Sequence, residues 1–233
     1  MLNRFNITKL IDKLRSDLAY SLAVKDIDPN QYPGEPDSGA FAQFMSRASE
    51  LSGPRILELG TRRAIADLST RHDALFPNAS EYLGTDIEMG VDVDFVADVH
   101  RLTQVTGEEQ FDIIFTEAGF EHFKYPQLAA MEMMRALRVG GLVFIQTHQT
   151  FPIHAVPYDY FRFSKEALAA LFGEGMGFKV HTVGYASPAS IYSRVDPDGR
   201  HAPAYLHVNL FGEKLAPTPT ELVYEFDCLT DAT

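Results

Sequence analysis

The stretch Arg55-Ile-Leu-Glu-Leu-Gly60 decides the fold, because an apolar run that ends in an acid and a glycine is typical of the first strand of a nucleotide-binding βα unit. A second run, Glu81-Tyr-Leu-Gly-Thr-Asp86, also ends in an acid, and a third acid, Asp98, follows the short segment 93–97. From residue 55 onward, strand-like runs alternate with helix-like runs. This alternation indicates a parallel sheet that is covered by helices on both faces.

The expected elements can be given as residue ranges. Strands are expected near 55–59, 81–86, 93–97, 111–116, 141–147, 177–183 and 204–211, and helices near 39–51, 62–73, 125–137 and 164–173, the last with Ser164 as its N-cap. The last two strands follow each other without an intervening helix, which suits an antiparallel sheet edge. We therefore expect an α/β fold with a Rossmann-like sheet of seven strands, mostly parallel with an antiparallel terminal strand.

An N-terminal helical extension is expected to precede the sheet, because apolar residues recur at helical spacing over residues 7–22. We assign residues 1–52 to this extension or cap and residues 53–233 to the main domain, within a single structural domain overall. The length of 233 residues is enough for one substantial core.

Composition and charge narrow the class of partner. The net charge of −12, from 20 basic and 32 acidic residues, disfavours binding to DNA or long RNA. No apolar stretch is long enough for a membrane span, the N-terminus has charges where a signal peptide needs an apolar region, and Cys228 is the only cysteine. We expect a cytoplasmic protein with a small-molecule partner and neither nucleic acid nor membrane as partners, and the sequence leaves a homodimer open.

The acids and the glycine at these strand ends resemble the cofactor pocket of class I S-adenosylmethionine-dependent methyltransferases, over roughly residues 53–212. The resemblance implies S-adenosylmethionine as cofactor and the following cofactor-binding residues: Glu58, Gly60, Thr61, Asp86, Ile87, Asp98, Val99, Thr116 and Glu117. The family's second and third loop glycines are replaced here by Arg62 and Ala64. Because a guanidinium would repel a sulfonium, we expect Arg62 to turn away from the cofactor or to pair with an acid.

Two of these acids have specific roles in the resemblance. Asp86 is expected to hold the ribose, since a carboxylate offers two acceptors to two vicinal hydroxyls, and Glu88 is the competing candidate. Asp98 corresponds to the position that faces the adenine amino group. A structural alternative for Asp86 is capping of a helix after the strand.

The long aromatic and polar stretch 147–164 follows the fifth strand, at the sheet edge where open α/β folds place ligands. Its pattern resembles a subgroup of small-molecule and sugar-associated methyltransferases. The candidate catalytic residues are His148, as first choice of general base, then His154 and Asp159, and the candidate substrate-binding residues are Tyr158, Arg162 and His122. The irregular spacing of His148, His154 and Asp159 offers no geometric reason to expect a metal ion, so none is assigned.

The leading functional prediction is methyl transfer from S-adenosylmethionine to an oxygen, nitrogen or carbon atom of a small molecule, in natural-product or saccharide biosynthesis. Two alternatives remain open. One is a catalytically inactive or repurposed binding protein with the same fold, which the altered glycine loop would suit. The other is a nicotinamide-dependent oxidoreductase, which the missing Gly-x-Gly-x-x-Gly turn disfavours.

Overall fold

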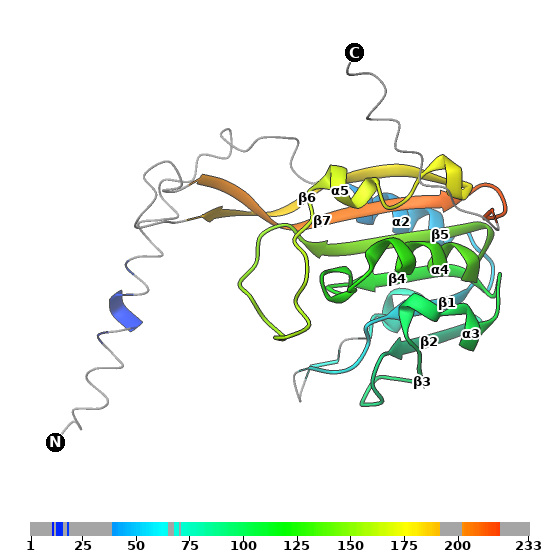
Figure 1. Ribbon diagram of the computed structural model, residues 1–233, viewed down its shortest axis with the longest axis horizontal. Helices are drawn as coiled ribbons and strands as arrows, with labels where there is room; N and C mark the ends of the chain where they lie inside the picture. Colours follow the sequence, from blue (N-terminus) through cyan, green and yellow to red (C-terminus); the bar gives the residue numbers. More distant parts are fainter. Residues whose placement is uncertain are drawn as a thin grey trace, which may run out of the picture.

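The fold is taken from a computed structural model, which describes residues 11, 13–15, 18, 39–64, 68–69, 71–191 and 202–219 (Figure 1). Most of the expected N-terminal helix over residues 7–22 lies outside these residues, although the described ones among them are helical. The proposed boundary between residues 52 and 53 remains a prediction. No helix among the described residues is both long and apolar enough to cross a membrane.

A seven-stranded sheet forms the centre of the molecule, in the order β3-β2-β1-β4-β5-β7-β6. Its strands are β1 (Arg55–Leu59), β2 (Glu81–Asp86), β3 (Phe95–Val96), β4 (Phe111–Glu117), β5 (Leu137–His148), β6 (Phe178–Ile191) and β7 (Ala202–Lys214). The first five strands pair in parallel, whereas β7 pairs antiparallel with both β5 and β6. The expected fold, a mostly parallel Rossmann-like sheet with an antiparallel terminal strand, is confirmed.

Helices cover the two faces of this sheet, and each face has its own apolar core. The helices are α2 (Ala40–Ser49), α3 (Thr103–Thr106), α4 (Pro126–Ala136) and α5 (Lys165–Ala169), with short 3-10 turns η2 (Asp73–Leu75), η3 (Val99–Arg101), η4 (Phe120–His122) and η5 (Glu174–Met176). Phe44 of α2 packs on one face with Phe115 and Phe144. The other face is covered by α4 and α5 (Figure 1). Alternating side chains of the buried strands thus supply both cores.

The expected helix over residues 62–73 is wrong for the residues that the structure describes there, which contain only the start of η2. Polar tertiary contacts hold this segment instead. Arg63 pairs with Asp92 through two nitrogens, at 2.8 and 3.0 Å, and its backbone N–H donates to Val91. These contacts tie the segment to the loop after β2, and they override its modest helical preference.

Several other elements have different bounds from those expected, among them α5, which ends at Ala169 rather than near residue 173. β5 begins at Leu137, because residues 138–141, expected as a turn, are included in the strand with a register shift opposite β4. β6 and β7 are longer than expected and pair from Phe178 and Lys214 to Ile191 and Ala202, forming a two-stranded ribbon beyond the rest of the sheet (Figure 1). Pro188 is tolerated in β6 because β6 is an edge strand. Ser164 caps α5 as expected, accepting from the N–H of Ala167 at 3.1 Å.

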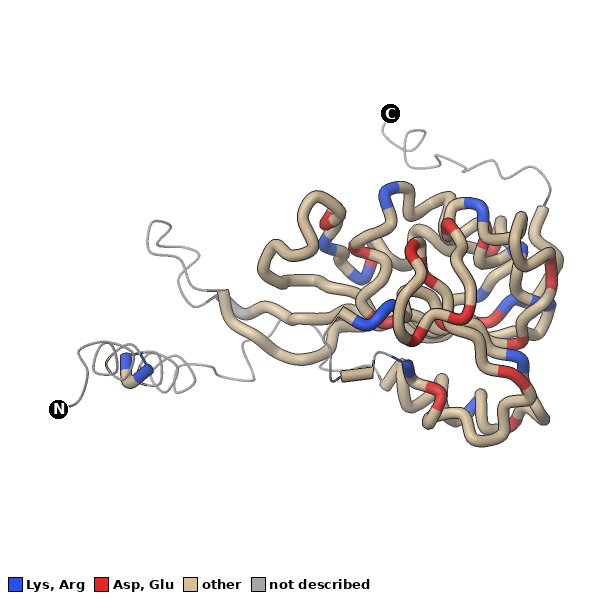
Figure 2. Tube along the Cα trace, turned by 90° about the horizontal axis from the view of Figure 1, so that it is seen from below, with Lys and Arg blue, Asp and Glu red and all other residues tan. Residues whose placement is uncertain are grey.

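Acidic and basic residues are interspersed along the trace of the described part of the chain (Figure 2). Several of the basic ones are already engaged by carboxylates, such as Arg71 with Asp94 at 2.7 Å and Arg138 with Asp112 at 3.1 Å. Pairs of this kind reduce the positive potential that a polyphosphate would need.

Candidate functional site

Three loops meet at the carboxyl ends of the parallel strands. Gly60 follows β1 with a positive φ of 81°, and a Cβ atom at this position would lie 3.9 Å from the Cα of Gly119, in the loop after β4. The N–H groups of Gly60 and Thr61 both donate to the carbonyl of Thr85, at 2.8 and 3.2 Å. Glycine is required at residue 60 because other residues are strained at this φ. The loops after β1, β2 and β4 therefore form one rim.

Asp86 ends β2 on this rim and is half-buried. Its two carboxylate oxygens accept from the backbone N–H groups of Arg62 and Glu88, at 3.3 and 3.2 Å. The side chain of Arg62 extends to Glu88, with 3.4 Å between Nη1 and Oε2, so the expectation that Arg62 pairs with an acid is confirmed. Glu88, the competing ribose candidate, is therefore engaged by Arg62, while Asp86 is oriented by backbone donors.

Asp98 lies at the start of η3, beside the end of β3. Its Oδ1 accepts from the backbone N–H of His100 at 3.0 Å and lies 2.6 Å from His100 Nδ1. Burial alone would raise the pKa of Asp98. The hydrogen bonds from His100 have the opposite effect and outweigh burial, so the pKa is lowered. Ile87, directly after Asp86, is 62% exposed, whereas Val99 packs against the core. Ile87 thus presents an apolar side chain at the rim, whereas Val99 belongs to the packing of the core.

Glu58 is buried, and its carboxylate is enclosed by protein groups. Nδ1 of His72 lies 2.6 Å from Oε1, and the backbone N–H of His72 and the hydroxyl of Tyr82 donate to Oε2 at 3.2 and 2.6 Å. Nε2 of His72 lies 3.3 Å from Glu117, at the end of β4. Hydrogen bonds to Glu117 and Glu58 raise the pKa of His72 to about 10. His72 is therefore protonated and links the ends of β1 and β4.

Of the expected cofactor residues, Thr61 and Thr116 are fully buried. The Thr116 hydroxyl donates to the carbonyl of Leu59 at 3.1 Å, which joins the end of β4 to the end of β1. A Cβ atom at Gly84 would lie 2.7 Å from Oγ1 of Thr61, so Thr61 packs closely beneath β2. These two threonines shape the rim rather than present their hydroxyls to solvent.

A second group of side chains surrounds Glu121, which lies in η4 and is 0% exposed. Its Oε1 is approached by Nε2 of three histidines: His148 at 3.1 Å, His122 at 3.8 Å and His154 at 4.0 Å. None of these contacts has hydrogen-bond geometry, and Oε1 has no hydrogen-bond partner among the described residues. Oε2 accepts from the hydroxyl of Thr147 at 2.7 Å. We call Glu121, His122, His148 and His154 the histidine cluster.

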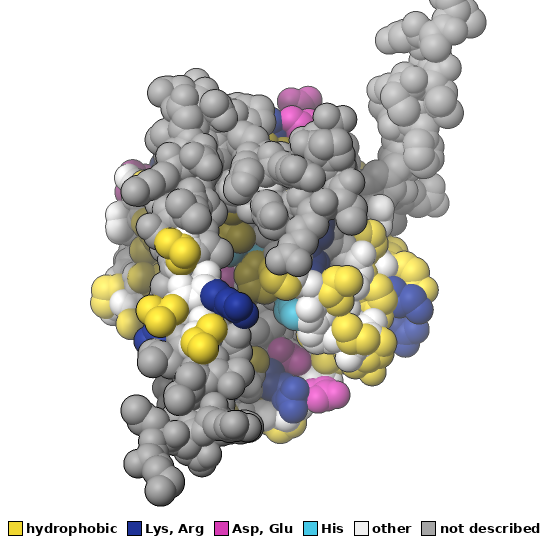
Figure 3. Space-filling view, turned by 90° about the vertical axis from the view of Figure 1, so that its left-hand side faces the viewer, with side chains coloured by type: hydrophobic (Ala, Val, Ile, Leu, Met, Phe, Trp, Pro, Cys, Tyr) yellow, Lys and Arg dark blue, Asp and Glu magenta, His cyan; other side chains and the backbone are white. Residues whose placement is uncertain are grey.

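The loop between β5 and α5 projects from the carboxyl end of β5 (Figure 1) and is hydrogen-bonded to residues of this cluster. The N–H groups of Tyr160 and Phe161 donate to the carbonyl of Glu121, at 2.9 and 3.1 Å. Phe151 stacks on His148 with ring centroids 4.0 Å apart. The loop also exposes apolar and aromatic side chains, which contribute to the hydrophobic surface on the face seen in Figure 3: Phe151, Ile153, Val156, Tyr158, Tyr160 and Phe161.

Asp159 and Arg162 form a partly buried ion pair within this loop. Two guanidinium nitrogens of Arg162 donate to the two oxygens of Asp159, at 2.6 and 2.8 Å. These bonds hold the pKa of Asp159 well below its usual range. Oδ2 of Asp159 also accepts from the backbone N–H of His154 at 2.9 Å. Asp159 and Arg162 therefore position His154, and Tyr158 remains largely exposed.

His148, the first choice of general base, is only 5% exposed, and its Nδ1 is buried without a hydrogen-bond partner among the described residues. Burial lowers the pKa of His148. The charge of Glu121 opposes this shift, and smaller effects of His207, His154 and Arg162 add to it. His122 and His154 are partly exposed and form the accessible edge of the cluster. The fold thus brings His122, His148 and His154 together, with Asp159 behind His154.

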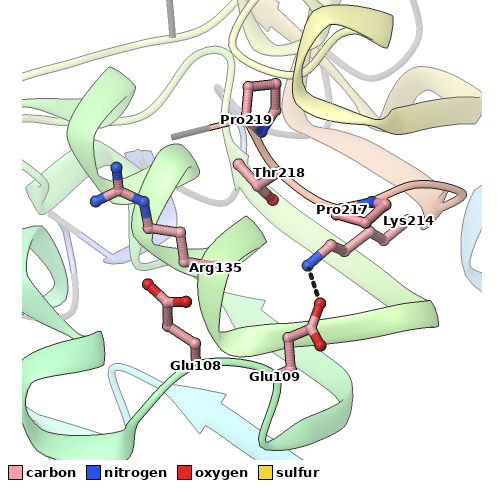
Figure 4. A pocket seen from close by; sticks show the side chains of 7 residues that line it. All are labelled: Glu108, Glu109, Arg135, Lys214, Pro217, Thr218 and Pro219. Atoms are coloured by element: carbon pink, nitrogen blue, oxygen red, sulfur yellow. Dashed lines mark hydrogen bonds and ion pairs between the residues drawn. The ribbon is translucent and has the colours of Figure 1, made fainter. Parts of the chain in front are cut away.

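A hollow of about 310 Å³ lies elsewhere, between the start of β4 and the end of β7 (Figure 4). The buried ammonium of Lys214 borders it and donates to the carbonyls of Met134 and Leu137 at 2.8 and 2.6 Å, and it lies 3.4 Å from Glu109. Lys214 thus caps the carboxyl end of α4. Because this hollow is at the amino edge of the parallel strands, opposite both groups described above, we do not place the chemistry there.

Two central residues were missed or underrated by sequence reasoning. His72 has no sequence signal, since it falls in a segment expected to be helical. Glu121 was not among the assigned site residues, and the available signal was an acid beside a histidine, four residues after the end of β4 and among apolar residues. Its burial depends on packing against β5 and the loop after it.

Comparisons with known proteins agree with this architecture. Residues 67–145 match the family model described as a methyltransferase domain. A comparison with curated protein sequences finds no match. Three solved structures have a similar fold. One is 1,6-didemethyltoxoflavin-N1-methyltransferase of Burkholderia thailandensis with 1,6-didemethyltoxoflavin and S-adenosylhomocysteine bound (16% identity, TM-score 0.52, 90% of each chain covered). The second is an S-adenosylmethionine-dependent methyltransferase of Archaeoglobus fulgidus (14% identity, TM-score 0.53, 74% of this chain and 92% of that chain covered). The third is an S-adenosylmethionine-dependent methyltransferase of Mesorhizobium loti (13% identity, TM-score 0.52, 76% of this chain and 98% of that chain covered).

At these identities the solved structures establish the fold, and the family model identifies the domain. Together they confirm the resemblance seen in the sequence. Residues 67–145 thus match a methyltransferase domain, and the sheet has the fold of solved S-adenosylmethionine-dependent methyltransferases.

Proposed function

We propose that this methyltransferase transfers the methyl group of S-adenosylmethionine to an oxygen, nitrogen or carbon atom of a small molecule bound beside the histidine cluster. The observation that carries the proposal is the arrangement of two groups at one edge of the sheet. The rim around Asp86 lies at the ends of β1 and β2, and the histidine cluster lies at the ends of β4 and β5. Open α/β sheets bind ligands at this edge.

The cofactor half of the proposal rests on the rim. Asp86 would accept hydrogen bonds from both ribose hydroxyls, Ile87 would pack on one face of the adenine, and Asp98 would accept from its amino group. The Oδ2 atom of Asp98 receives no hydrogen bond from the described residues, so it has an acceptor to offer. Glu117, held by His72, lies at the end of β4, where the resemblance places the methionine part of the cofactor.

The acceptor half rests on the loop between β5 and α5. Its exposed aromatic side chains, among them Tyr158, offer flat apolar surface to an acceptor, and Arg162 and His122 add polar groups. In the Burkholderia thailandensis neighbour the bound acceptor is a small molecule. A small molecule also suits this chain, because its net charge of −12 disfavours nucleic acid. We keep a cytoplasmic location and a homodimer as expectations.

The chemistry needs an acceptor atom in line with the methyl and, for a hydroxyl or protonated amine, removal of a proton. We assign proton removal to His148 and His154, with Asp159 acting through His154 by positioning it. Glu121 orients the imidazoles from below. His148 is buried, whereas His154 is partly exposed, so His154 is the imidazole that meets an acceptor first.

Calorimetric titration with S-adenosylhomocysteine tests the cofactor half. We expect one binding site per chain and a clear loss of affinity in Asp86→Ala. Folded wild-type protein that binds neither S-adenosylhomocysteine nor S-adenosylmethionine would favour the repurposed binding protein, and tight binding of reduced nicotinamide instead would favour the oxidoreductase.

Release of S-adenosylhomocysteine in the presence of a panel of hydroxylated and amino-substituted small molecules tests the acceptor half. For an acceptor that must lose a proton, His154→Ala should lower turnover by about 10²-fold or more with little change in cofactor affinity. His181→Ala is the matched control, because His181 contacts Glu213 on the sheet edge, away from the cluster. Unimpaired turnover in both His148→Ala and His154→Ala would remove the loop from the chemistry and leave Glu117, Glu121 and His122 to be tested.

A further inference from the structure

We propose that Glu121, His148 and His154 form a binding site for a divalent transition-metal ion, of which Zn²⁺ fits the donor set best. This inference comes from the geometry of the histidine cluster. One ligand atom from each of the three residues lies within 4.8 Å of the others. From sequence spacing alone we assigned no metal. The fold changes that conclusion because it brings a residue of η4, the last residue of β5 and a loop residue to one point.

The buried carboxylate of Glu121 is the first argument. Its Oε1 has no hydrogen-bond partner among the described residues, and no guanidinium or ammonium group makes an ion pair with it there. Arg162 interacts with Glu121 through its charge, but its guanidinium forms its ion pair with both oxygens of Asp159. A buried charge without a partner is strongly unfavourable. A bound cation would supply the missing charge.

The second argument is the direction of the imidazole lone pairs. Nδ1 of His154 lies 3.1 Å from the carbonyl of Pro152 and 3.4 Å from Asp159. A carbonyl oxygen can only accept, and this contact is shorter than the 3.5 Å between Nδ1 and the donor Nη2 of Arg162, so Nδ1 carries the proton and Nε2 presents its lone pair toward Glu121. Two electron-rich atoms facing each other at 4.0 Å are explained by a cation between them.

The surrounding contacts match those that orient metal ligands. Thr147 donates to the other oxygen of Glu121 at 2.7 Å, which leaves Oε1 directed into the cluster. Asp159 and Pro152 together hold the far side of the His154 ring, as a carboxylate or carbonyl commonly does for a ligating histidine. The separations of 3.1 and 4.0 Å from Oε1 are close to those between ligands of a tetrahedral ion, about 3.3 Å for bonds near 2.0–2.2 Å.

Two imidazoles and one carboxylate leave at least one position for a further ligand, as in catalytic zinc sites. With an ion bound, His148 and His154 are ligands and no longer accept the proton, so proton removal passes from them to His122. His122 can take this role because its Nδ1 donates to the carbonyl of Tyr158 at 2.8 Å and its Nε2 carries the lone pair. If an acceptor hydroxyl occupies the open position, its O–H bond breaks and the proton passes to His122. The oxygen then bonds the methyl carbon as the sulfur–methyl bond breaks with its electron pair on sulfur. Activation of an acceptor by the bound ion rests on the proposed function, but the presence of the metal site does not.

The experiment is metal binding by the full chain after removal of bound metal with a chelator. Titration with Zn²⁺ should show one tight ion per chain, and titration with Co²⁺ should produce visible absorption without the charge-transfer band of a thiolate ligand. His154→Ala should weaken Zn²⁺ binding more than tenfold, and Asp159→Asn, which changes only a supporting contact, by about tenfold. His181→Ala should bind as the wild type does.

No tight Zn²⁺ or Co²⁺ binding by the wild type, or equal binding by folded His154→Ala, would overturn the proposal. Because Glu121 is buried, Glu121→Gln could unfold the chain, so circular dichroism of each variant accompanies the titration and His154→Ala decides the outcome. Binding of S-adenosylhomocysteine, measured separately, tells the two proposals apart. Metal binding without cofactor binding contradicts only the proposed function, and the reverse result contradicts only the metal site.

Discussion

Replacement of His72 by glutamine should change how the stability of the protein depends on pH. The imidazole of His72 lies between two carboxylates, 2.6 Å from Glu58 and 3.3 Å from Glu117. These two contacts raise its pKa to about 10, from 6.5 for an unperturbed histidine. Glutamine keeps one donor in the same place but cannot become charged.

The sign of this pH dependence follows from the direction in which the pKa of His72 is shifted. Above pH 6.5 the folded protein holds a proton on His72 that the unfolded chain has released, so the stabilisation is complete below pH 6.5 and is lost as the pH rises to about 10. Between pH 7 and pH 9 the free energy of unfolding can lose at most about 2.7 kcal/mol of the contribution from His72, which is two pH units at about 1.36 kcal/mol each. Because the ring is 31% exposed, solvent screening should reduce this to about 1–1.5 kcal/mol.

Urea unfolding at pH 7, 8 and 9 measures this effect as the difference between the wild type and His72→Gln. The wild type should lose about 1–1.5 kcal/mol more of its unfolding free energy over this range than the variant does. His181→Gln is the control, because His181 contacts a single carboxylate, Glu213, at 3.1 Å. Parallel pH profiles for the wild type and His72→Gln would refute the argument that His72 is protonated between Glu58 and Glu117.

Three further changes test the rim and the helix cap. Asp86→Ala should weaken S-adenosylhomocysteine binding by about 1.5–3 kcal/mol in calorimetry, and unchanged affinity in a folded variant would remove Asp86 from the ribose site. Arg62→Gly should leave this affinity equal or make it tighter, because it removes only the side chain that pairs with Glu88 at 3.4 Å, whereas a large loss would show that Arg62 is itself a ligand. Ser164→Ala should lower the unfolding free energy by about 0.5–2 kcal/mol through loss of the bond to Ala167, and an unchanged melting temperature would contradict this role.

The sequence by itself determined the sheet and its approximate strand positions. β1 and β2 have the bounds expected from their apolar runs, because burial in a parallel sheet requires continuous apolar residues. The antiparallel terminal strand and the Ser164 cap were equally predictable, since both depend on neighbours in the chain. The positions of Asp86 and Asp98 beside strand ends follow from the same local pattern.

Only the tertiary structure decided which polar residues meet. The segment around His72 was expected to be helical, but it contacts Glu58, Glu117 and the loop after β2 instead. No local sequence pattern predicts these partners. His148 and His154 are six residues apart in an irregular loop, and only the packing of that loop onto Glu121 directs both imidazoles at one carboxylate oxygen. The physical reason is that strands and caps depend on neighbouring residues, whereas these clusters depend on burial and charge across long sequence separations.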